Sequence, residues 1–222
     1  MSDPARFVPI VYDPTIADAC LTYGHIYRRP QGMYLTKAMK GRFADVLRNW
    51  PVKDIRFICV TSGGRILGLG DIGANGAPIP IGKLQLYTAC AAVPPDALLP
   101  IHLDIGTTNA KLRADALYMG LRDVPPSDDD LDALVDEFME AANTVFPGVC
   151  VHFEDWKGTD AIRLLARYKK KYLVLNDDIQ GTASVTIAGL TTALQIKNET
   201  LSDQKILFAG AGSAGIGIAN MI

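Results

Sequence analysis

The 222-residue sequence predicts an α/β protein in which parallel strands alternate with helices. From residue 149 onward, short apolar runs alternate with helical patterns over short connections, as they do in βαβ units. Acidic residues follow two successive apolar runs of this region. A G-x-G-x-x-G pattern follows a third apolar run and leads into a further helical pattern. These observations favour a parallel sheet whose strand ends carry polar side chains.

The N-terminal part of the chain contains regular elements separated by segments rich in Pro and Gly. Asp13-Pro14 predicts the start of a helix, because Asp accepts hydrogen bonds at a helix N-terminus and Pro fits the first turn. The run IRFICV, residues 55–60, predicts a buried strand. Residues 66–82 contain too much Gly and Pro for a regular element and predict a long loop.

The next segment predicts two helices on either side of a strand. Residues 83–93 are expected to form a helix that ends before a Pro-Pro pair, and a strand is expected near 99–103. Residues 127–146 predict an amphipathic helix, because apolar side chains recur at helical spacing. The apolar face of that helix would hold Leu131, Leu134, Val135, Phe138 and Ala142.

The C-terminal part of the chain predicts strands and helices in regular alternation. The strands are expected at 149–153, 172–175 and 205–209, with helices at 158–171 and 182–196. Pro and Gly are much more frequent before this region than within it. We therefore expect a change of domain here, with one domain at residues 1–179 and the beginning of a second at 180–222.

The composition is ordinary for a globular protein, with 49% apolar and 21% charged residues. A net charge of −2, without a basic stripe, gives no indication of nucleic-acid binding. No apolar stretch is long enough to span a bilayer, so no membrane partner is expected. The four cysteines have no paired spacing and lie in apolar contexts, which favours buried thiols in a reducing compartment. We expect a cytoplasmic protein, or one of an organelle matrix if a targeting segment is missing.

Acidic side chains are expected to gather at one edge of the sheet. Glu154-Asp155 and Asp177-Asp178 each follow a predicted strand. If the strands are parallel, both pairs emerge at the carboxyl edge, where open α/β sheets bind ligands. Four carboxylates there would repel one another unless a cation neutralised them, and oxygen ligands suit Mg²⁺ or Mn²⁺. The alternative is that each pair caps the helix that follows it.

The G-x-G-x-x-G pattern occurs twice. Gly210, Gly212 and Gly215 stand between an apolar run and a helical pattern, as in the turn that holds a pyrophosphate in Rossmann domains. The alternative for these three is a glycine-rich turn without a ligand. The earlier copy, GLGDIG at 68–73, runs into a further Gly- and Pro-rich stretch, and we interpret it as a loop around a substrate.

Three more polar residues are candidates for a site. Lys83 stands among apolar residues at the predicted start of a helix. Burial and the helix dipole would lower its pKa there and suit it to act as a general base. The alternative is a lysine whose stem packs while its amine reaches water. Tyr12 by itself is typical of a half-buried aromatic residue, and Arg65 has the planar guanidinium that binds carboxylates.

Several stretches of the sequence resemble signature blocks of the malic enzyme family. The stretches are PIVYDPTIADAC, YGHIYRRPQG, VTSGGRILGLGDIGANGAPIPIGKLQLYTAC, HFEDW and LNDDIQGTASVTIAGL. The resemblance runs from about residue 7 to the C-terminus. It implies an oxidoreductase that oxidatively decarboxylates malate to pyruvate and CO₂, with NAD or NADP and a divalent cation, Mg²⁺ or Mn²⁺. A malolactic-type relative shares this scaffold and is the alternative within the family.

The resemblance also implies a role for each candidate residue. Tyr12 matches the catalytic tyrosine of the family, and Lys83 matches its catalytic lysine. Asp177 matches the aspartate that supports this lysine, and Arg65 the arginine that contacts substrate and cofactor. The implied metal ligands are Glu154, Asp155 and Asp178, and the implied cofactor-binding residues are Gly210, Gly212 and Gly215.

By the same resemblance, family members continue through a complete Rossmann domain, whereas this sequence covers its first strand, turn and helix start. We therefore expect the isolated chain to be inactive and to bind NAD(P) weakly. The full-length enzyme is expected to be a homo-oligomer. The alternative from another functional class is a non-catalytic module that binds a metal ion and a dicarboxylate, or that supports assembly.

Overall fold

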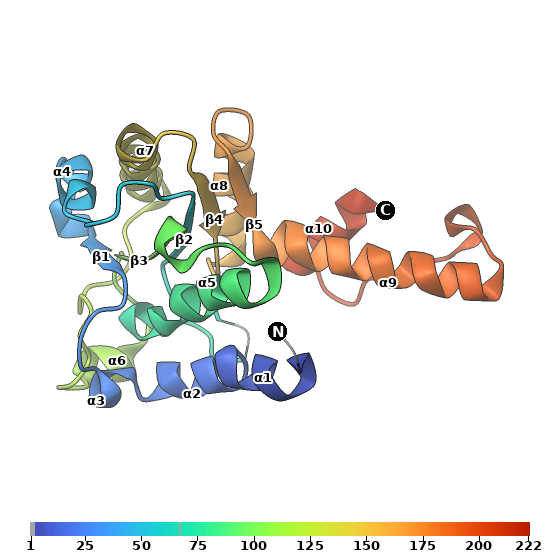
Figure 1. Cartoon of the computed structure of the whole chain (residues 1–222), viewed down its shortest axis with the longest axis horizontal. Coiled ribbons are helices and arrows are strands. Elements are labelled where there is room, and N and C mark those ends of the chain that lie inside the picture. Colours follow the sequence, from blue (N-terminus) through green and yellow to red (C-terminus); the bar gives the residue numbers. More distant parts are fainter. Residues whose placement is uncertain (1–2, 67) are drawn as a thin grey trace.

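Five parallel strands form the centre of the computed structural model, which describes residues 3–66 and 68–222 (Figure 1). Their spatial order is β1-β3-β2-β4-β5, and each neighbouring pair is parallel. The strands are β1 (Met33–Thr36), β2 (Phe57–Thr61), β3 (Leu98–Asp104), β4 (Cys150–Phe153) and β5 (Val174–Asn176). The predicted α/β fold class with parallel βαβ units is confirmed.

Helices connect the strands and cover both faces of the sheet. The α-helices are α1 (Pro4–Val11), α2 (Thr15–Leu21), α3 (Tyr23–Ile26), α4 (Phe43–Arg48), α5 (Pro78–Ala91), α6 (Ala110–Ala114), α7 (Asp128–Val145), α8 (Gly158–Tyr168), α9 (Thr182–Lys197) and α10 (Ser213–Met221). Short 3-10 turns occupy Lys37–Met39, Gly73–Gly76, Pro95–Ala97 and Leu201–Asp203, and a π-helical turn occupies Asp177–Gly181. Among the described residues, no helix combines the length and apolar character needed to cross a bilayer.

The two faces of the sheet differ, because successive side chains of a strand point in opposite directions. Ile58 and Val60 of β2 belong to the main apolar core, which α4, α7 and α8 cover on one side. Cys59, between them, belongs to a smaller cluster beneath α5 on the other side. Helices α1 and α2 contact α5 from outside, so the α5 face has two helical layers (Figure 1).

The loop predicted at 66–82 is only partly correct, because α5 begins at Pro78 rather than at Lys83. Pro78 and Pro80 lie in its first turn, where backbone N–H groups have no partner within the helix and Pro is tolerated. The helix ends at Ala91, near the predicted Pro-Pro boundary. Lys83 therefore lies in the second turn of α5, away from the N-terminal end of the helix dipole.

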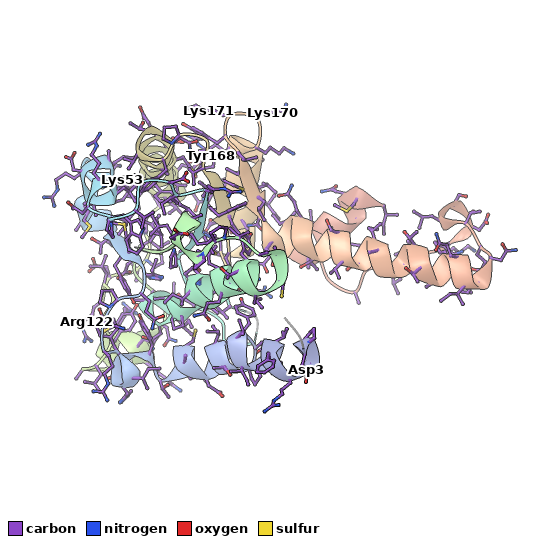
Figure 2. The ribbon with its side chains drawn as sticks, in the orientation of Figure 1. Asp3, Lys53, Arg122, Tyr168, Lys170 and Lys171 are labelled. Carbon is purple, nitrogen blue, oxygen red and sulfur yellow. The ribbon has the colours of Figure 1, made fainter. Side chains whose placement is uncertain are left out.

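The start of a helix near Asp13-Pro14 is confirmed, but the predicted capping is wrong. Helix α2 begins at Thr15 with Pro14 at the N-cap position and without a side-chain cap. A further helix, α1, precedes it and was not expected. Asp3, labelled in Figure 2, caps α1 by accepting a hydrogen bond from the backbone N–H of Arg6.

The strand predicted at residues 205–209 is wrong for this structure, in which the segment belongs to no strand. An apolar run forms a strand only beside a hydrogen-bonding partner, and the sheet of the described residues ends at β5. Leu207 is 92% exposed, which agrees with the absence of a neighbouring strand. The segment links α9, which projects from the body, to α10 (Figure 1).

The buried cysteines are confirmed at three of four positions. Cys20, Cys59 and Cys150 are buried free thiols, whereas Cys90 is exposed. Cys90 lies in the last turn of α5, where Cys90 and Ala91 are both exposed. The apolar face predicted for 127–146 is also confirmed, because its five residues are buried in α7.

Candidate functional site

The carboxyl edge of β4 and β5 brings the predicted acidic residues together. The two strands are parallel neighbours, with Phe153 beside Asn176, so the residues that follow both strands emerge at the same edge. A cavity of about 230 Å³ lies there. Its polar lining includes Tyr12, Lys83, Glu154, Asp155, Asp177 and Asp178.

Lys83 is the centre of this arrangement. Its Nζ lies 2.9 Å from Glu154 Oε1 and 2.9 Å from Asp177 Oδ2, and its side chain is only 14% exposed. Because one carboxylate follows β4 and the other follows β5, the lysine of α5 connects the ends of two strands. The alternative of a lysine with its amine in water is therefore wrong.

The prediction of a lowered pKa for Lys83 is also wrong for the chain by itself. Burial acts to lower the pKa, as expected. The negative charges of Glu154 and Asp177, together with Tyr12, outweigh burial and raise the pKa above its usual value. The predicted contribution of the helix dipole is absent, since Lys83 is not in the first turn.

Tyr12 lies against the lysine, at the junction of α1 and α2. The Nζ of Lys83 lies 4.9 Å from the centre of the Tyr12 ring. Burial and the charge of Glu154 raise the pKa of Tyr12 above its usual value, so the phenol holds its proton. Gly82 permits this contact, because a Cβ at that position would lie 2.8 Å from Tyr12 Cδ2 and closer still to Ile16.

Asp155 and Asp178 complete a cluster of four carboxyl groups whose negative charge the neighbouring side chains do not neutralise. Burial and the charges of Glu154 and Asp178 raise the pKa of Asp155 to about 8. Burial, Glu154 and Asp177 likewise raise the pKa of Asp178. Asp155 also has a left-handed backbone, with φ of 53°, which non-glycine residues adopt rarely and often at functional sites. This donor set suits a hard divalent cation, because oxygen ligands and negative charge are what such an ion requires.

The alternative that these carboxylates cap helices is contradicted by their contacts. Helix α8 has no side-chain cap, and the π-helical turn Asp177–Gly181 is capped by Asn176, whose Oδ1 accepts from the backbone N–H of Ile179. Among the described residues, no backbone N–H donates to a side-chain carboxylate oxygen of Glu154, Asp155, Asp177 or Asp178. π-Helical turns are frequent at functional sites, and this one sets the positions of both aspartates.

Arg65 lies near the cluster but lines a different cavity. Its backbone N–H donates to the carbonyl oxygen of Asp155 over 3.4 Å, and its side chain is exposed. The neighbouring cavity of about 450 Å³ includes Arg65, Ser62 and Lys157 in its lining. The structure thus brings Arg65 to the same sheet edge without a salt bridge to the four carboxylates, although its charge acts to lower the pKa values of Asp155 and Asp178.

The glycine turn approaches the edge but lines neither cavity. Gly212 caps α10, and Gly210 has φ of 120°, a conformation that suits glycine. A Cβ on Gly215 would lie 3.1 Å from the carbonyl oxygen of Gly210, so the turn is tight. Helix α10 packs on the turn Asp177–Gly181, with Gly217 against the carbonyl oxygen of Ile179.

Tyr87 and His152 contact the site and were not expected from the sequence. His152 Nε2 meets Glu154 Oε2, and His152 Nδ1 lies 2.7 Å from Tyr87 Oη. The signal was present in the spacing. Tyr87 is one helical turn after Lys83, and His152 is two strand positions before Glu154, so each pair shares a face.

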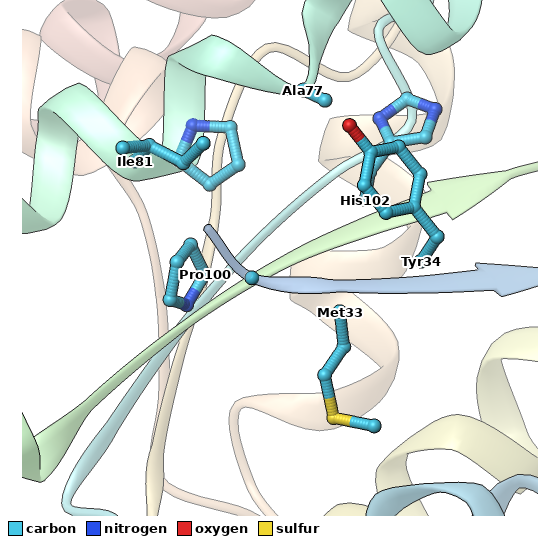
Figure 3. A pocket seen from close by; sticks show the side chains of 8 residues that line it. Met33, Tyr34, Ala77, Ile81, Pro100 and His102 are labelled. Atoms are coloured by element: carbon cyan, nitrogen blue, oxygen red, sulfur yellow. The ribbon is translucent and has the colours of Figure 1, made fainter. Parts of the chain in front are cut away.

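A second buried histidine lies apart from the site. Both ring nitrogens of His102 lack a hydrogen-bond partner among the described residues, and burial lowers the pKa of His102 to about 4 against a smaller opposing effect of Asp104. Its ring borders a cavity of about 10 Å³ with Tyr34 and Pro100 (Figure 3). That volume is close to the minimum for one water molecule.

Comparison with known proteins points to one family. Residues 1–169 match the family described as Malic enzyme, N-terminal domain, and residues 179–222 match Malic enzyme, NAD binding domain. The chain is 51% identical over its whole length to the NADP-dependent malic enzyme of Mus musculus, and spans 39% of that protein. It is 50% identical to the chloroplastic NADP-dependent malic enzyme of Zea mays, covering 98% of this chain and 34% of that protein.

A solved structure has the same fold. The crystal structure of Entamoeba histolytica malic enzyme superposes with a TM-score of 0.60, covering 95% of this chain and 42% of that chain. At 23% sequence identity, this likeness shows the fold alone. The family match over residues 1–169 includes strands β1 to β4, Tyr12, Lys83 and the pair Glu154-Asp155, whereas β5 lies between the two matches. The chain belongs to the malic enzyme family.

Proposed function

We propose that the protein oxidatively decarboxylates malate to pyruvate and CO₂, with NAD(P) and either Mg²⁺ or Mn²⁺. The observation that carries this proposal is the buried amine of Lys83, held between Glu154 and Asp177 in a cavity lined by two further carboxylates. The names of the relatives support the reaction and NADP as cofactor. The chain spans about two fifths of the Mus musculus protein, so the activity is proposed for the protein that contains it.

Glu154, Asp155 and Asp178 are the residues that would hold the cation. They are oxygen donors at one edge, and the raised pKa values of the two aspartates indicate that their charges are poorly compensated. When bound, the cation would supply a Lewis acid at the substrate, and NAD(P) would accept hydride from C2 of malate.

Lys83, Asp177 and Tyr12 would move the protons. With the cation offsetting the carboxylate charges that raise its pKa, Lys83 would take the proton of the C2 hydroxyl as a neutral amine, and Asp177 keeps the amine in place from 2.9 Å. Tyr12 would protonate C3 of the enol of pyruvate after CO₂ departs, and Lys83, whose Nζ lies 4.9 Å from the centre of the Tyr12 ring, would help to restore its proton. The raised pKa of Tyr12 suits a group that carries a proton until the product needs it.

We further propose that the substrate- and metal-binding domain occupies residues 1–179 and that a nucleotide-binding domain begins at 180. The two family matches, which end at 169 and begin at 179, support this division. Gly210, Gly212 and Gly215 would bind the pyrophosphate of NAD(P), and Arg65 would contact substrate and cofactor. The protein would be a homo-oligomer of the cytoplasm, with an organelle as the alternative because the Zea mays relative is chloroplastic.

The test combines metal binding and turnover in the protein that carries this sequence. Mn²⁺ affinity, measured by electron paramagnetic resonance, should fall at least about tenfold in Asp178→Asn, because a charged ligand is lost. Malate-dependent reduction of NADP should require Mn²⁺ and disappear in the same variant. Equal Mn²⁺ affinity in wild type and Asp178→Asn would contradict the metal assignment. Tight Mn²⁺ binding without turnover would favour a non-catalytic binding module.

A further inference from the structure

A chain of hydrogen bonds runs from the interior of the protein to the cavity. Tyr87 Oη lies 2.7 Å from His152 Nδ1, and His152 Nε2 meets Glu154 Oε2. His152 is only 1% exposed. The other oxygen of this carboxylate, Oε1, lies 2.9 Å from Lys83 Nζ. The two oxygens of Glu154 therefore have different neighbours, one a fixed imidazole and the other the amine that borders the cavity.

The positions of four residues, two on α5 and two at the end of β4, produce this arrangement. Lys83 and Tyr87 are one turn apart on α5, which separates them by about 6 Å along the helix. His152 and Glu154 share a face of the sheet and lie about 6.6 Å apart along the chain. Because the two spacings nearly match, α5 contacts this segment at two successive points. Lys83 meets Glu154 at one point, and Tyr87 meets His152 at the other.

The hydrogen-bond partners of His152 indicate which of its two ring nitrogens carries the hydrogen. A carboxylate only accepts hydrogen bonds, so Nε2 donates to Glu154. In the neutral imidazole, Nδ1 is then left to accept from the Tyr87 hydroxyl. The Tyr87 ring is stacked on the imidazole at a centroid distance of 5.9 Å, and it forms a T-shaped pair with the Phe57 ring at 5.4 Å. These contacts hold both rings in the orientation that the chain of hydrogen bonds requires.

We propose that His152 is a positioning residue for Glu154, set in orientation by Tyr87. By holding Oε2, it fixes the orientation of the carboxylate, so that Oε1, beside Lys83, would be the oxygen presented to the cation. This inference rests on the proposed function, which makes Glu154 a metal ligand. Residues that hydrogen-bond to metal ligands typically change metal affinity by about 10- to 100-fold when they are replaced.

Mn²⁺ affinity, measured by electron paramagnetic resonance in four proteins, tests the proposal. We expect His152→Leu to weaken binding by about 10- to 100-fold relative to wild type. His152→Gln should restore affinity to within about threefold of wild type, because its amide can donate to Glu154 and accept from Tyr87. Tyr87→Phe should weaken binding less than His152→Leu, since the ring and the imidazole donor remain.

Two controls separate positioning from a general effect on the fold. Leu98→Ala removes apolar volume from the cluster that contains Cys59 and Leu84 on the same face, and it should leave Mn²⁺ affinity unchanged. The ¹⁵N resonances of the His152 ring in the wild-type protein should show hydrogen on Nε2. Hydrogen on Nδ1 would overturn the proposal even if the variants failed to fold.

The outcome for Asp178→Asn distinguishes the two proposals. If that variant binds Mn²⁺ as tightly as wild type, the proposed function fails. If Asp178→Asn weakens binding while His152→Leu does not, only the positioning role is overturned. Equal weakening by His152→Leu and His152→Gln would also overturn it, because the hydrogen bond would then not be the cause.

Discussion

The two faces of strand β4 carry different kinds of side chain. Val151 and Phe153 point into the main core beneath α7 and α8, where they contact apolar residues. His152, between them, points toward α5 and is hydrogen-bonded at both ring nitrogens. Glu154 continues this second face beyond the end of the strand and meets Lys83. Within one short segment, one face stabilises the fold and the other holds the polar groups of the site.

This difference has a physical cost and a consequence. The apolar face gains free energy from burial, at roughly 25 cal/mol per Å² of apolar surface. The α5 face instead buries charged groups, which is costly unless each has a partner. Stability and function should therefore respond to different substitutions, and four predictions test that separation.

The largest effect is expected on the α5 face. Lys83→Met should lower the rate of malate oxidation by about 10²- to 10⁴-fold, because a positioned acid–base group is lost. The matched control is Lys40→Met, which removes an exposed lysine and should leave the rate unchanged. Steady-state kinetics at saturating Mn²⁺ measure both. A Lys83→Met rate within tenfold of wild type would exclude Lys83 from the proton transfers.

The main core gives the next largest effect, on stability instead of chemistry. Phe138→Ala in α7 should lower the free energy of unfolding by about 3–5 kcal/mol, because the side chain is fully buried. Urea unfolding measures this loss. The folded fraction should bind Mn²⁺ as wild type does. A large loss of Mn²⁺ affinity would show that the two faces are coupled.

His102 gives a pH-dependent effect. Because its pKa is lowered from 6.5 to about 4 in the folded chain, the unfolded chain takes up a proton that the folded chain does not between these pH values. Stability should therefore fall by up to about 3 kcal/mol as the pH falls from 6.5 to 4, at about 1.4 kcal/mol per pKa unit.

The matched variant is His102→Leu, which removes both the titrating group and its unpartnered ring nitrogens. Urea unfolding at pH 7 and pH 4.5 compares the variant with wild type. The loss of stability on acidification should be smaller in the variant. An equal loss in both proteins would assign the acid sensitivity to other groups.

The smallest effect on stability is expected at the protein surface, away from both faces of the sheet. Lys170, labelled in Figure 2, is exposed in the turn after α8. Lys170→Gln should change the free energy of unfolding by less than about 0.5 kcal/mol, as surface substitutions usually do. Thermal unfolding checks this value. A larger change would reveal a contact of this lysine that the folded chain by itself does not show.

The parallel sheet could be predicted because its signals are local. Strands β4 and β5 are apolar runs separated by an amphipathic helix, and this pattern specifies a βαβ unit. Because parallel neighbours end at the same edge, this unit also predicts that Glu154 and Asp177 emerge there together. The start of α5 could not be predicted, because Pro78 and Pro80 are typical of loops and are tolerated only in a first helical turn.

Two features depend on contacts that the sequence pattern does not specify. The apolar run at 205–209 has the composition of a strand but lacks a neighbouring strand among the described residues. The pKa of Lys83 was predicted in the wrong direction, because its sign depends on whether burial or the nearby carboxylates have the larger effect. That balance is set by distances of 2.9 Å between side chains far apart in the sequence.

The most direct test of the central claim is the position of Mn²⁺ in a crystal of the protein soaked with that ion, located by its anomalous scattering. Our account predicts one strong peak among the carboxylates of Glu154, Asp155 and Asp178, beside Lys83. A peak elsewhere on the chain, or a fully soaked crystal without a peak at this edge, would contradict the assignment of the α5 face as the metal-binding face.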